Sequence, residues 1–293
     1  GDPGQVIYGW FDALCNYVTA LDYGSGGEAG WAGAGRRIHL LGKGVLRFHA
    51  VYWPAMLLSS GQPLPAGIFV HDYLTAGGQK ISKSSGAGAD PAALAAEYGP
   101  DAVRWWLLRE VPRVGDADFT VERMIARADD ELANGLGNLV NRVVAMIGRY
   151  RDGRVDGGCG DGPVPAGGAD LAAAIRQAGG LIAAALEDFD FRRATEAAWA
   201  IADEANRFVN RARPWDLARA ERDGDAGAGR RLDAVLGILF EACSGLGRDL
   251  QPFLPDAAER ISRQCAPRGG RLPPTTPVFR RLSSPSQPSQ DGQ

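Results

Sequence analysis

The sequence predicts an α/β segment followed by an all-α segment. Residues 5–100 alternate short apolar runs with helical patterns, as α/β segments do. From about residue 119 onward, long Ala-rich amphipathic segments follow one another without a strand signal. A chain of 293 residues is long enough to hold two domains of ordinary size.

The α/β segment contains a strand–helix–strand pattern. The run Arg37–Leu41 predicts a buried strand that ends at Gly42, and residues 45–59 carry apolar residues at helical spacing. Residues 68–70 predict a second strand, and glycines at 77 and 78 open a loop. Asp90 and the proline after it predict a helix start, with Asp as the N-cap. Ligands bind beyond the carboxyl ends of strands in open α/β sheets, so we expect an active loop beyond the second strand.

The all-α segment predicts a helix bundle. Amphipathic patterns cover roughly residues 119–150, 169–188, 190–212, 229–248 and 255–265. Gly-rich linkers are expected at 152–168 and 223–229. The tail 283–293 is rich in Ser, Pro and Gln and is expected to be disordered.

Composition excludes several classes of protein. The net charge of −3 argues against a bulk electrostatic nucleic-acid binder, although a local basic surface stays possible. No uninterrupted apolar stretch approaches the roughly 20 residues of a membrane span. The four cysteines match neither a metal-binding spacing nor a dense disulfide framework, which favours a reduced, cytoplasmic protein without a zinc site. The start Gly1–Gly4 has no initiator Met, and we interpret it as an internal cut.

Lysine is rare in this chain. Only Lys43, Lys80 and Lys83 are found among 32 basic residues, and we expect such lysines where a compact ammonium group is needed. Two of them lie in the loop Gly77–Ser84, which also holds glycines and the hydroxyls of Ser82 and Ser84. Glycines allow backbone N–H groups to approach phosphates, and lysines three residues apart can neutralise a triphosphate. The alternative is a basic surface loop.

The loop Lys80-Ile81-Ser82-Lys83-Ser84 is similar to the KMSKS signature of class I aminoacyl-tRNA synthetases, with Ile81 in the place of Met. The resemblance implies that Lys80 and Lys83 stabilise the pyrophosphate leaving group when an aminoacyl-adenylate forms. It implies that Ser82 and Ser84 belong to the same ATP site, and we add Lys43 to the predicted catalytic residues. ATP is the expected substrate, accompanied by Mg²⁺.

A second segment, Gly9–Tyr17, resembles the part of methionyl-tRNA synthetases that lines the amino-acid pocket. The resemblance implies that Trp10, Ala13 and Tyr17 bind methionine, together with His49 and Val45, which lies one helical turn before it. Aromatic faces, small apolar walls and one histidine suit a thioether side chain, which is apolar and polarizable. The alternative for each aromatic residue is core packing, which we favour for Trp53.

The all-α segment carries a polar ladder. Asn134, Asn138 and Arg142 recur at i, i+4 and i+8, so they project from one helix face. Asn and Arg hydrogen-bond the base edges of single-stranded RNA, and an aromatic ring such as Trp215 offers a stacking platform. This ladder and the pair Pro214-Trp215 resemble the positions with which methionyl-tRNA synthetases read the CAU anticodon. The alternative is an ordinary polar helix face.

The resemblance divides the chain into four parts. It implies the C-terminal half of a partial Rossmann-type nucleotide-binding domain at 1–97 and a connecting segment at 98–118. A helix-bundle anticodon-binding domain is implied at 119–268, before a tail at 269–293. The implied function is ATP-dependent attachment of methionine to tRNA(Met) through methionyl-adenylate, and the implied localisation is cytoplasmic.

The sequence also departs from the family. None of the histidines forms the His-x-Gly-His motif, and the first half of the nucleotide-binding fold that carries it is missing. That half could stand on another chain. The family's Gly-Lys-Asp is here Gly42-Lys43-Gly44, so one carboxylate near the substrate is lost. We therefore expect the isolated chain to be inactive, and the alternative is a tRNA-binding paralogue or regulatory module without catalysis.

Overall fold

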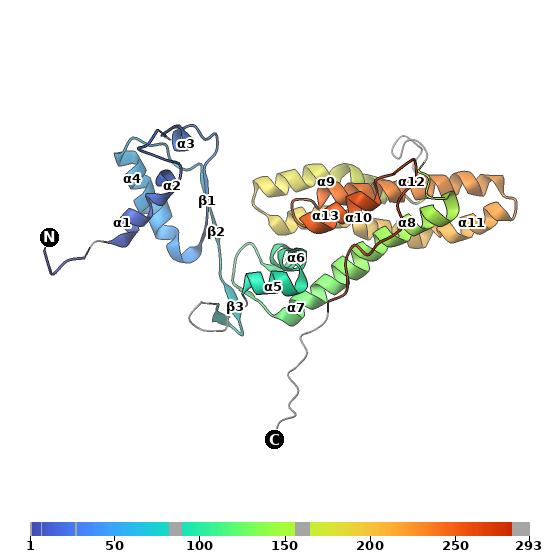
Figure 1. Ribbon diagram of the computed structural model, residues 1–293, viewed down its shortest axis with the longest axis horizontal. Coiled ribbons are helices and arrows are strands. Elements are labelled where there is room, and N and C mark those ends of the chain that lie inside the picture. The colour runs from blue at the N-terminus through green and yellow to red at the C-terminus, as the bar shows by residue number, and fades with distance from the viewer. Residues whose placement is uncertain (1, 7, 27, 82–89, 156–164, 283–293) are drawn as a thin grey trace, which may run out of the picture. The chain divides into compact units, whose positions relative to one another are not determined.

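The computed structural model describes residues 2–6, 8–26, 28–81, 90–155 and 165–282. The chain forms two compact units. The first comprises Gly1–Thr75 and Arg113–Ala117, and the second comprises Ala76–Pro112 and Asp118–Gln293. Figure 1 labels the α-helices of both units and strands β1, β2 and β3.

The first unit is built around a parallel strand pair. Strand β1 (Ile38–Gly42) pairs with β2 (Gly67–His71), with Ile38 opposite Gly67 and Gly42 opposite His71. Between the strands the chain forms a 3₁₀ turn η1 (Lys43–Val45), a π-helical turn η2 (Phe48–Tyr52) and helix α4 (Trp53–Ser59). The predicted strand–helix–strand unit is confirmed, although the helical stretch changes type twice along its length.

The core of the first unit is aromatic. Short helices α1 (Gly9–Ala13), α2 (Asn16–Thr19) and α3 (Glu28–Ala32) precede β1. They bury Leu14, Val18 and Trp31 against Trp53 and Leu57 of α4. The expectation that 37–41 is buried throughout is wrong for Leu40, which is 63% exposed, whereas His39 and Leu41 on the other face are buried. Successive side chains in a strand point to opposite faces, and only one face of β1 is covered.

Three further short strands follow, and the chain passes from one unit to the other within two of them, after Thr75 and after Ala117. They form a sheet of order β4-β3-β5, with β3 (Leu74–Ala76), β4 (Gln79–Lys80) and β5 (Ala117–Asp118). The N–H of Gly78 donates to Asp118 Oδ1 at 3.0 Å. That bond fixes the turn between β3 and β4, whose glycines 77 and 78 both have positive φ.

The second unit is helical. It contains α5 (Pro91–Tyr98), α6 (Pro100–Glu110), α7 (Val121–Arg127), the π-helix η3 (Ala128–Gly137), α8 (Asn138–Arg151), α9 (Ala169–Glu187), α10 (Phe191–Ala212), α11 (Pro214–Arg222), α12 (Ala226–Asp249) and α13 (Pro255–Gln264). The predicted N-cap of α5 is confirmed, because Asp90 Oδ1 accepts from Ala92 N at 2.9 Å.

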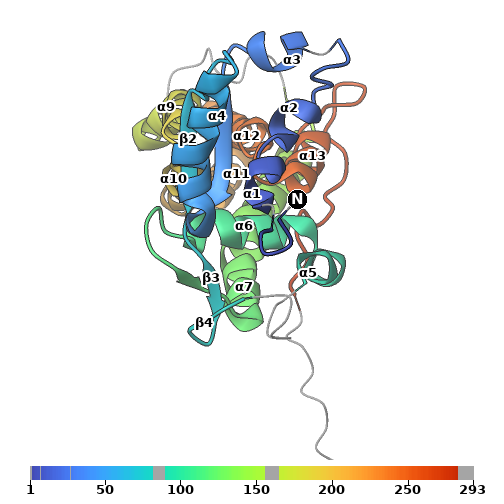
Figure 2. The ribbon, with the colours of Figure 1, turned by 90° about the vertical axis from the view of Figure 1, so that its left-hand side faces the viewer.

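Helix α12 is central to the bundle. It packs against α8, α9, α10, α11 and α13. Figure 2 views these helices from one end, with α12 between the α9–α10 pair and α13. Helix α9 is apolar enough to cross a membrane by length and composition alone, but Asp170 and Arg176 interrupt its apolar run, so the sequence expectation of no uninterrupted apolar span is not contradicted. Its buried residues, among them Leu171, Ile175, Ala178 and Ile182, recur at helical spacing and give it one face for packing against α10.

Two boundaries in the helical half differ from the prediction. Helix α11 was missed, although Pro214 is a proline at the first helical position and therefore a start signal. Arg213 has φ 45°, which ends α10 and separates the two helices. The predicted linker 223–229 is also too long, because Asp225 caps α12 through the N–H groups of Gly227 and Ala228. The expected disordered tail 283–293 and most of the expected linker 152–168 lie outside the described residues.

Candidate functional site

The first unit brings Tyr17 and His49 together across 32 residues of sequence. The Tyr17 hydroxyl lies 2.8 Å from His49 Nε2, and His49 Nδ1 lies 2.9 Å from the Val45 carbonyl. A carbonyl only accepts, so Nδ1 carries the proton and Nε2 accepts from Tyr17. Burial raises the pKa of the Tyr17 phenol, which keeps the proton on its donor. Tyr17, Val45 and His49 thus form one hydrogen-bonded chain.

His39 lies against this chain and was not among the predicted site residues. Its Nε2 accepts from Trp53 Nε1 at 3.1 Å, and its ring centroid lies 4.3 Å from that of Tyr17. Burial, together with the neighbouring His49, lowers the pKa of His39. Because its Nε2 must stay unprotonated to accept, a neutral His39 fits both the burial and the hydrogen bond.

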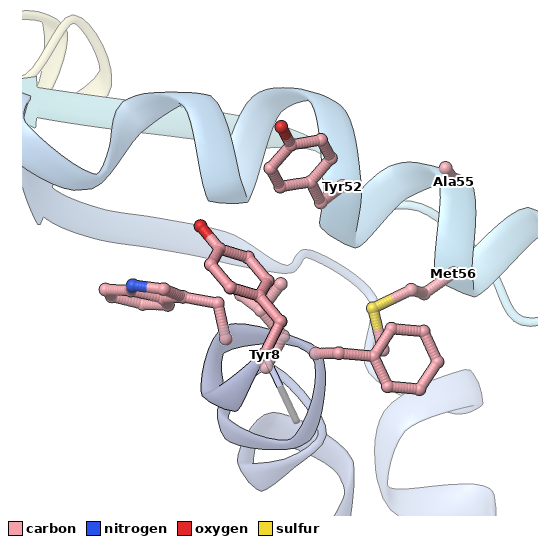
Figure 3. Close-up of a pocket in the computed structure, with 7 residues that line it drawn as sticks. Tyr8, Tyr52, Ala55 and Met56 are labelled. Carbon is pink, nitrogen blue, oxygen red and sulfur yellow. The ribbon is translucent and has the colours of Figure 1, made fainter. Parts of the chain in front are cut away.

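Trp10 joins the cluster to an open cavity. Its ring stacks on Phe48 with centroids 4.1 Å apart and meets His49 edge-on at 6.4 Å. The cavity, of about 360 Å³, is lined by Tyr8, Trp10, Phe11, Leu14, Tyr52, Ala55 and Met56. Figure 3 shows Tyr8 on one side of it and Tyr52, Ala55 and Met56 on the other. The lining is almost wholly apolar, which suits an apolar side chain.

The predicted methionine residues are brought together only in part. Trp10, Tyr17, Val45 and His49 meet, whereas Ala13 is exposed at the end of α1 and does not line the cavity. Of the predicted set only Trp10 lines the cavity, and His49 is 4% exposed. The remaining cavity walls come from aromatic and apolar residues in and beside α1, in η2 and in α4, which were not predicted as site residues.

Lys43 lies just beyond the carboxyl end of β1 and is bound by two carboxylates. Its Nζ is 2.7 Å from Asp116 Oδ1 and 2.9 Å from Asp72 Oδ1. Asp116 also accepts from Tyr73 N, and Asp72 from Gly115 N. The hydrogen bonds that Lys43 donates to Asp116 and Asp72 raise the pKa of Lys43. The same bonds lower the pKa of both carboxyl groups, so the cluster is ionised at neutral pH.

Gly44 follows Lys43, at the place of the missing family carboxylate. A Cβ atom at this position would collide with the Tyr73 hydroxyl. Tyr73 comes two residues after the end of β2, at the edge of the sheet where Lys43 lies. The space of a side chain at position 44 is therefore taken by the phenol of Tyr73, from the segment between β2 and β3.

The lysine loop is described only at its start. Lys80 belongs to β4, and Ile81 follows it. The predicted ATP residues Ser82, Lys83 and Ser84 lie outside the described residues. Among the residues that the structure does describe, no group of three or more His, Cys, Asp or Glu side chains could hold a metal ion.

The polar ladder lies where η3 passes into α8. Asn134 and Asn138 are exposed, and Arg142 one turn further on is half-buried. The stretch before Asn138 is a π-helix, not the expected α-helix. Asn206 of α10 donates to the Gly135 carbonyl at 3.2 Å, which ties this π-helix to the bundle. π-Helical turns are rare and are found frequently at functional sites.

Pro214 and Trp215 begin α11 in the same unit as the ladder. Pro214 is buried, whereas 37% of Trp215 is exposed. The left-handed backbone at Arg213 and the ion pair of Arg213 with Asp216 at 2.5 Å mark the start of the helix.

Comparison with known proteins identifies the relatives of the chain. Residues 1–144 match a family model described as tRNA synthetases class I (M). Methionine–tRNA ligase 1 of Bacillus cereus is 35% identical over 96% of the chain, and methionine–tRNA ligase of Mycobacterium bovis is 37% identical over 98%. The structure of Mycobacterium tuberculosis methionyl-tRNA synthetase bound by methionyl-adenylate aligns with 95% of the chain at a TM-score of 0.83 and 33% identity.

The chain is thus similar to methionyl-tRNA synthetases over almost its whole length.

The chain spans only part of these family members. It covers 44% of the Bacillus cereus ligase, 57% of the Mycobacterium bovis ligase and 57% of the Mycobacterium tuberculosis structure. The described cysteines, Cys15, Cys243 and Cys265, are free thiols.

Three contacts that shape the candidate sites were not predicted from the sequence. Phe48 stacks on Trp10, His39 accepts from Trp53, and Tyr73 fills the space beside Gly44. A signal existed for His39, which alternates with exposed residues on a predicted strand and so belongs to the covered face. No local sequence pattern predicts the contact of Phe48 with Trp10 or that of Tyr73 with Gly44, because each joins different elements of the first unit.

Proposed function

We propose that this chain recognises tRNA(Met) through its anticodon and takes part in ATP-dependent attachment of methionine to that tRNA. The chain's similarity to methionine–tRNA ligases over 90% or more of its length supports the proposal. The observation that carries it is the exposure of Asn134 of η3 and Asn138 at the start of α8, in the same unit as a partly exposed Trp215. Amide groups that read base edges and an indole that stacks on a base are the elements of single-strand recognition.

The chemistry proceeds in two steps. The methionine carboxylate attacks the α-phosphorus of ATP, which forms methionyl-adenylate and releases pyrophosphate. A ribose hydroxyl at the tRNA 3′ end then attacks the carbonyl carbon and releases AMP. We assign Trp10, Tyr17, Val45 and His49 to the methionine side chain and Lys80 and Lys83, with Ser82 and Ser84, to the phosphates. A loop lysine would stabilise the charge that develops on the leaving pyrophosphate.

A second candidate is a tRNA-binding paralogue without catalysis. Any side chain at position 44 would collide with Tyr73, so the family carboxylate could be placed at this position only if Tyr73 moved. This collision favours the paralogue without catalysis. Methionine-dependent exchange of label between pyrophosphate and ATP separates the candidates, measured with the protein as its gene encodes it. Exchange that Lys83→Ala abolishes supports the ligase, and a complete lack of exchange supports the paralogue.

Anticodon recognition is tested by binding. We expect the chain to bind tRNA with a CAU anticodon more tightly than the same tRNA with one anticodon base changed, at one salt concentration. Trp215→Ala should weaken CAU binding by roughly 5- to 150-fold, the effect of losing one base stack. Titration of fluorescently labelled tRNA measures both values.

A matched control is Leu181→Ala on α9, which removes another exposed apolar side chain of the same unit. It should leave binding unchanged. Equal, salt-sensitive binding of wild-type protein to every tRNA would contradict anticodon recognition and leave only a charge-driven interaction.

A further inference from the structure

The C-terminal segment Thr276–Leu282, called here the strap, is fastened to the bundle at both ends. At its start, Gln264 of α13 exchanges hydrogen bonds with both backbone groups of Thr276. Arg260 Nε donates to the Val278 carbonyl at 2.7 Å, and Val278 is 1% exposed. At its end, Leu282 N donates to Asp129 of η3 at 2.8 Å. Figure 1 shows this part of the chain, in dark red, running along α8 toward α7.

The strap passes close to the polar ladder. A Cβ atom at Gly137, the last residue of η3, would lie 3.5 Å from Phe279 N and 3.1 Å from the Leu132 carbonyl. A methyl group at position 137 would therefore already be in van der Waals contact with the strap. This approach places the strap beside Asn138, the next residue of the ladder.

Arg281 lies between the Val278 and Leu282 anchors and reaches the ladder itself. Its Nη2 donates to Asn134 Oδ1 at 2.9 Å, a contact between residues 147 positions apart. A guanidinium can only donate, so the bonded atom of the Asn134 amide is its oxygen. The bond therefore selects one of the two amide orientations that a free Asn side chain interconverts between.

From this geometry we infer that Arg281 is a positioning residue that sets which hydrogen-bonding group Asn134 offers to an RNA base. With its oxygen engaged by Arg281, Asn134 presents two N–H donors outward. It then selects base edges that accept, such as the O2 and N3 atoms of cytosine, over edges that donate. The inference rests on the proposed anticodon recognition and adds to it a residue outside the ladder.

A simpler role for Arg281 would be attraction of the RNA backbone. A backbone contact carries no sequence information and weakens binding of all RNAs alike when it is removed. The adjacent Arg280 is also exposed and offers a matched control, since its removal changes the net charge by the same amount one residue away.

The experiment compares Arg281→Ala, Arg280→Ala and Arg281→Lys in the full chain. For each, binding is measured to tRNA with a CAU anticodon and to three variants, each with one base changed. We expect Arg281→Ala to reduce discrimination at one anticodon position roughly fivefold or more, the effect of one hydrogen bond. Arg281→Lys keeps a hydrogen-bond donor and should retain part of the discrimination that Arg281→Ala loses. Arg280→Ala should lower affinity for all four RNAs alike.

The Asn134→Ala background gives the decisive comparison. If Arg281 acts through Asn134, Arg281→Ala should change discrimination no further once Asn134 is gone. Unchanged discrimination in Arg281→Ala, or an equal loss for all RNAs in both arginine variants, would overturn the inference while leaving anticodon recognition intact. Wild-type protein that does not discriminate would overturn the proposed function together with it. Thermal unfolding of each variant confirms that the exposed arginines are not needed for folding.

Discussion

Single residues in the first unit show how buried polar groups are accommodated. His39 and His49 are both buried, and each has its ring nitrogen paired with a specific donor or acceptor. A buried polar group without a partner costs about 1–3 kcal/mol. The bond that His39 accepts from Trp53, together with burial, favours a neutral His39 ring, and the Val45 carbonyl places a proton on Nδ1 of His49. Gly44 is constrained in another way, because the Tyr73 hydroxyl occupies the space that a side chain at this position would need.

Gly44→Ala should destabilise the first unit by about 1–3 kcal/mol, because the new methyl group forces Tyr73 to move. The partner variant Tyr73→Phe removes the hydroxyl and leaves the nearest ring carbon 3.6 Å from the methyl group, which is ordinary contact. We therefore expect Gly44→Ala to lower the free energy of unfolding less in the Tyr73→Phe background than in the wild type. Urea unfolding of the four proteins measures this cycle.

Gly35→Ala is the control for the effect of glycine replacement itself, since a Cβ there meets nothing within 4 Å. A double variant as unstable as the sum of both single changes would show that Tyr73 is not what excludes a side chain at position 44.

At the scale of elements, sequence periodicity predicted the parts whose signals are local. The strand pair, the cap of α5 and helices α9, α10 and α13 follow from apolar spacing and from capping residues. The π-helices η2 and η3 have no such local signal, because they depend on contacts with other elements. In η3, for example, the Gly135 carbonyl accepts a hydrogen bond from Asn206 of α10. The candidate sites were predicted from family resemblance, whereas their actual neighbours, such as Arg281 beside Asn134, depend on long-range packing.

Asp101 illustrates such a long-range effect on a helix. It stands in the first turn of α6, yet its Oδ2 accepts from Ala257 N, at 2.7 Å, in the first turn of α13. Leu254, at the N-cap position of α13, provides no side-chain cap. Arg104, one turn further along α6, donates to the carbonyls of Pro252 and Phe253 just before α13. Two side chains of α6 therefore hold the start of α13.

Asp101→Ala should lower the free energy of unfolding by about 1–3 kcal/mol, because it removes a cap and leaves a buried N–H unpaired. Asp101→Asn keeps an acceptor oxygen and should cost less. Chemical denaturation followed by circular dichroism measures the difference. Asp256→Ala serves as the control, since it removes an exposed carboxylate from the first turn of the same helix. Equal losses for Asp256→Ala and Asp101→Ala would indicate a helix-dipole effect instead of the cap.

At the scale of the whole molecule, the two units should respond to acid in opposite directions. In the first unit, burial and His49 lower the pKa of His39 below its ordinary 6.5. In the second unit, burial raises the pKa of Asp101 and of Asp203 above the ordinary 3.8. A buried histidine loses stability as pH falls, because the unfolded chain takes up the proton first. A buried carboxyl with a raised pKa gains stability as pH falls, because the folded state takes up the proton first.

Between pH 7 and pH 5.5 we therefore expect the first unit alone to lose stability. The loss begins near pH 6.5 and cannot exceed about tenfold in the unfolding equilibrium per pH unit, since one group binds one proton. Asp72 and Asp116 do not contribute in this window, because Lys43 lowers their pKa values further below 3.8.

Hydrogen–deuterium exchange, corrected for the intrinsic rate at each pH, should show falling protection in peptides from 38–59 and steady protection in α10 and α12. His39→Gln keeps an acceptor for Trp53 but does not titrate, so it should remove the pH dependence. If protection of 38–59 still falls in that variant, another group governs the acid response, and if α10 and α12 lose protection equally, the two units unfold as one.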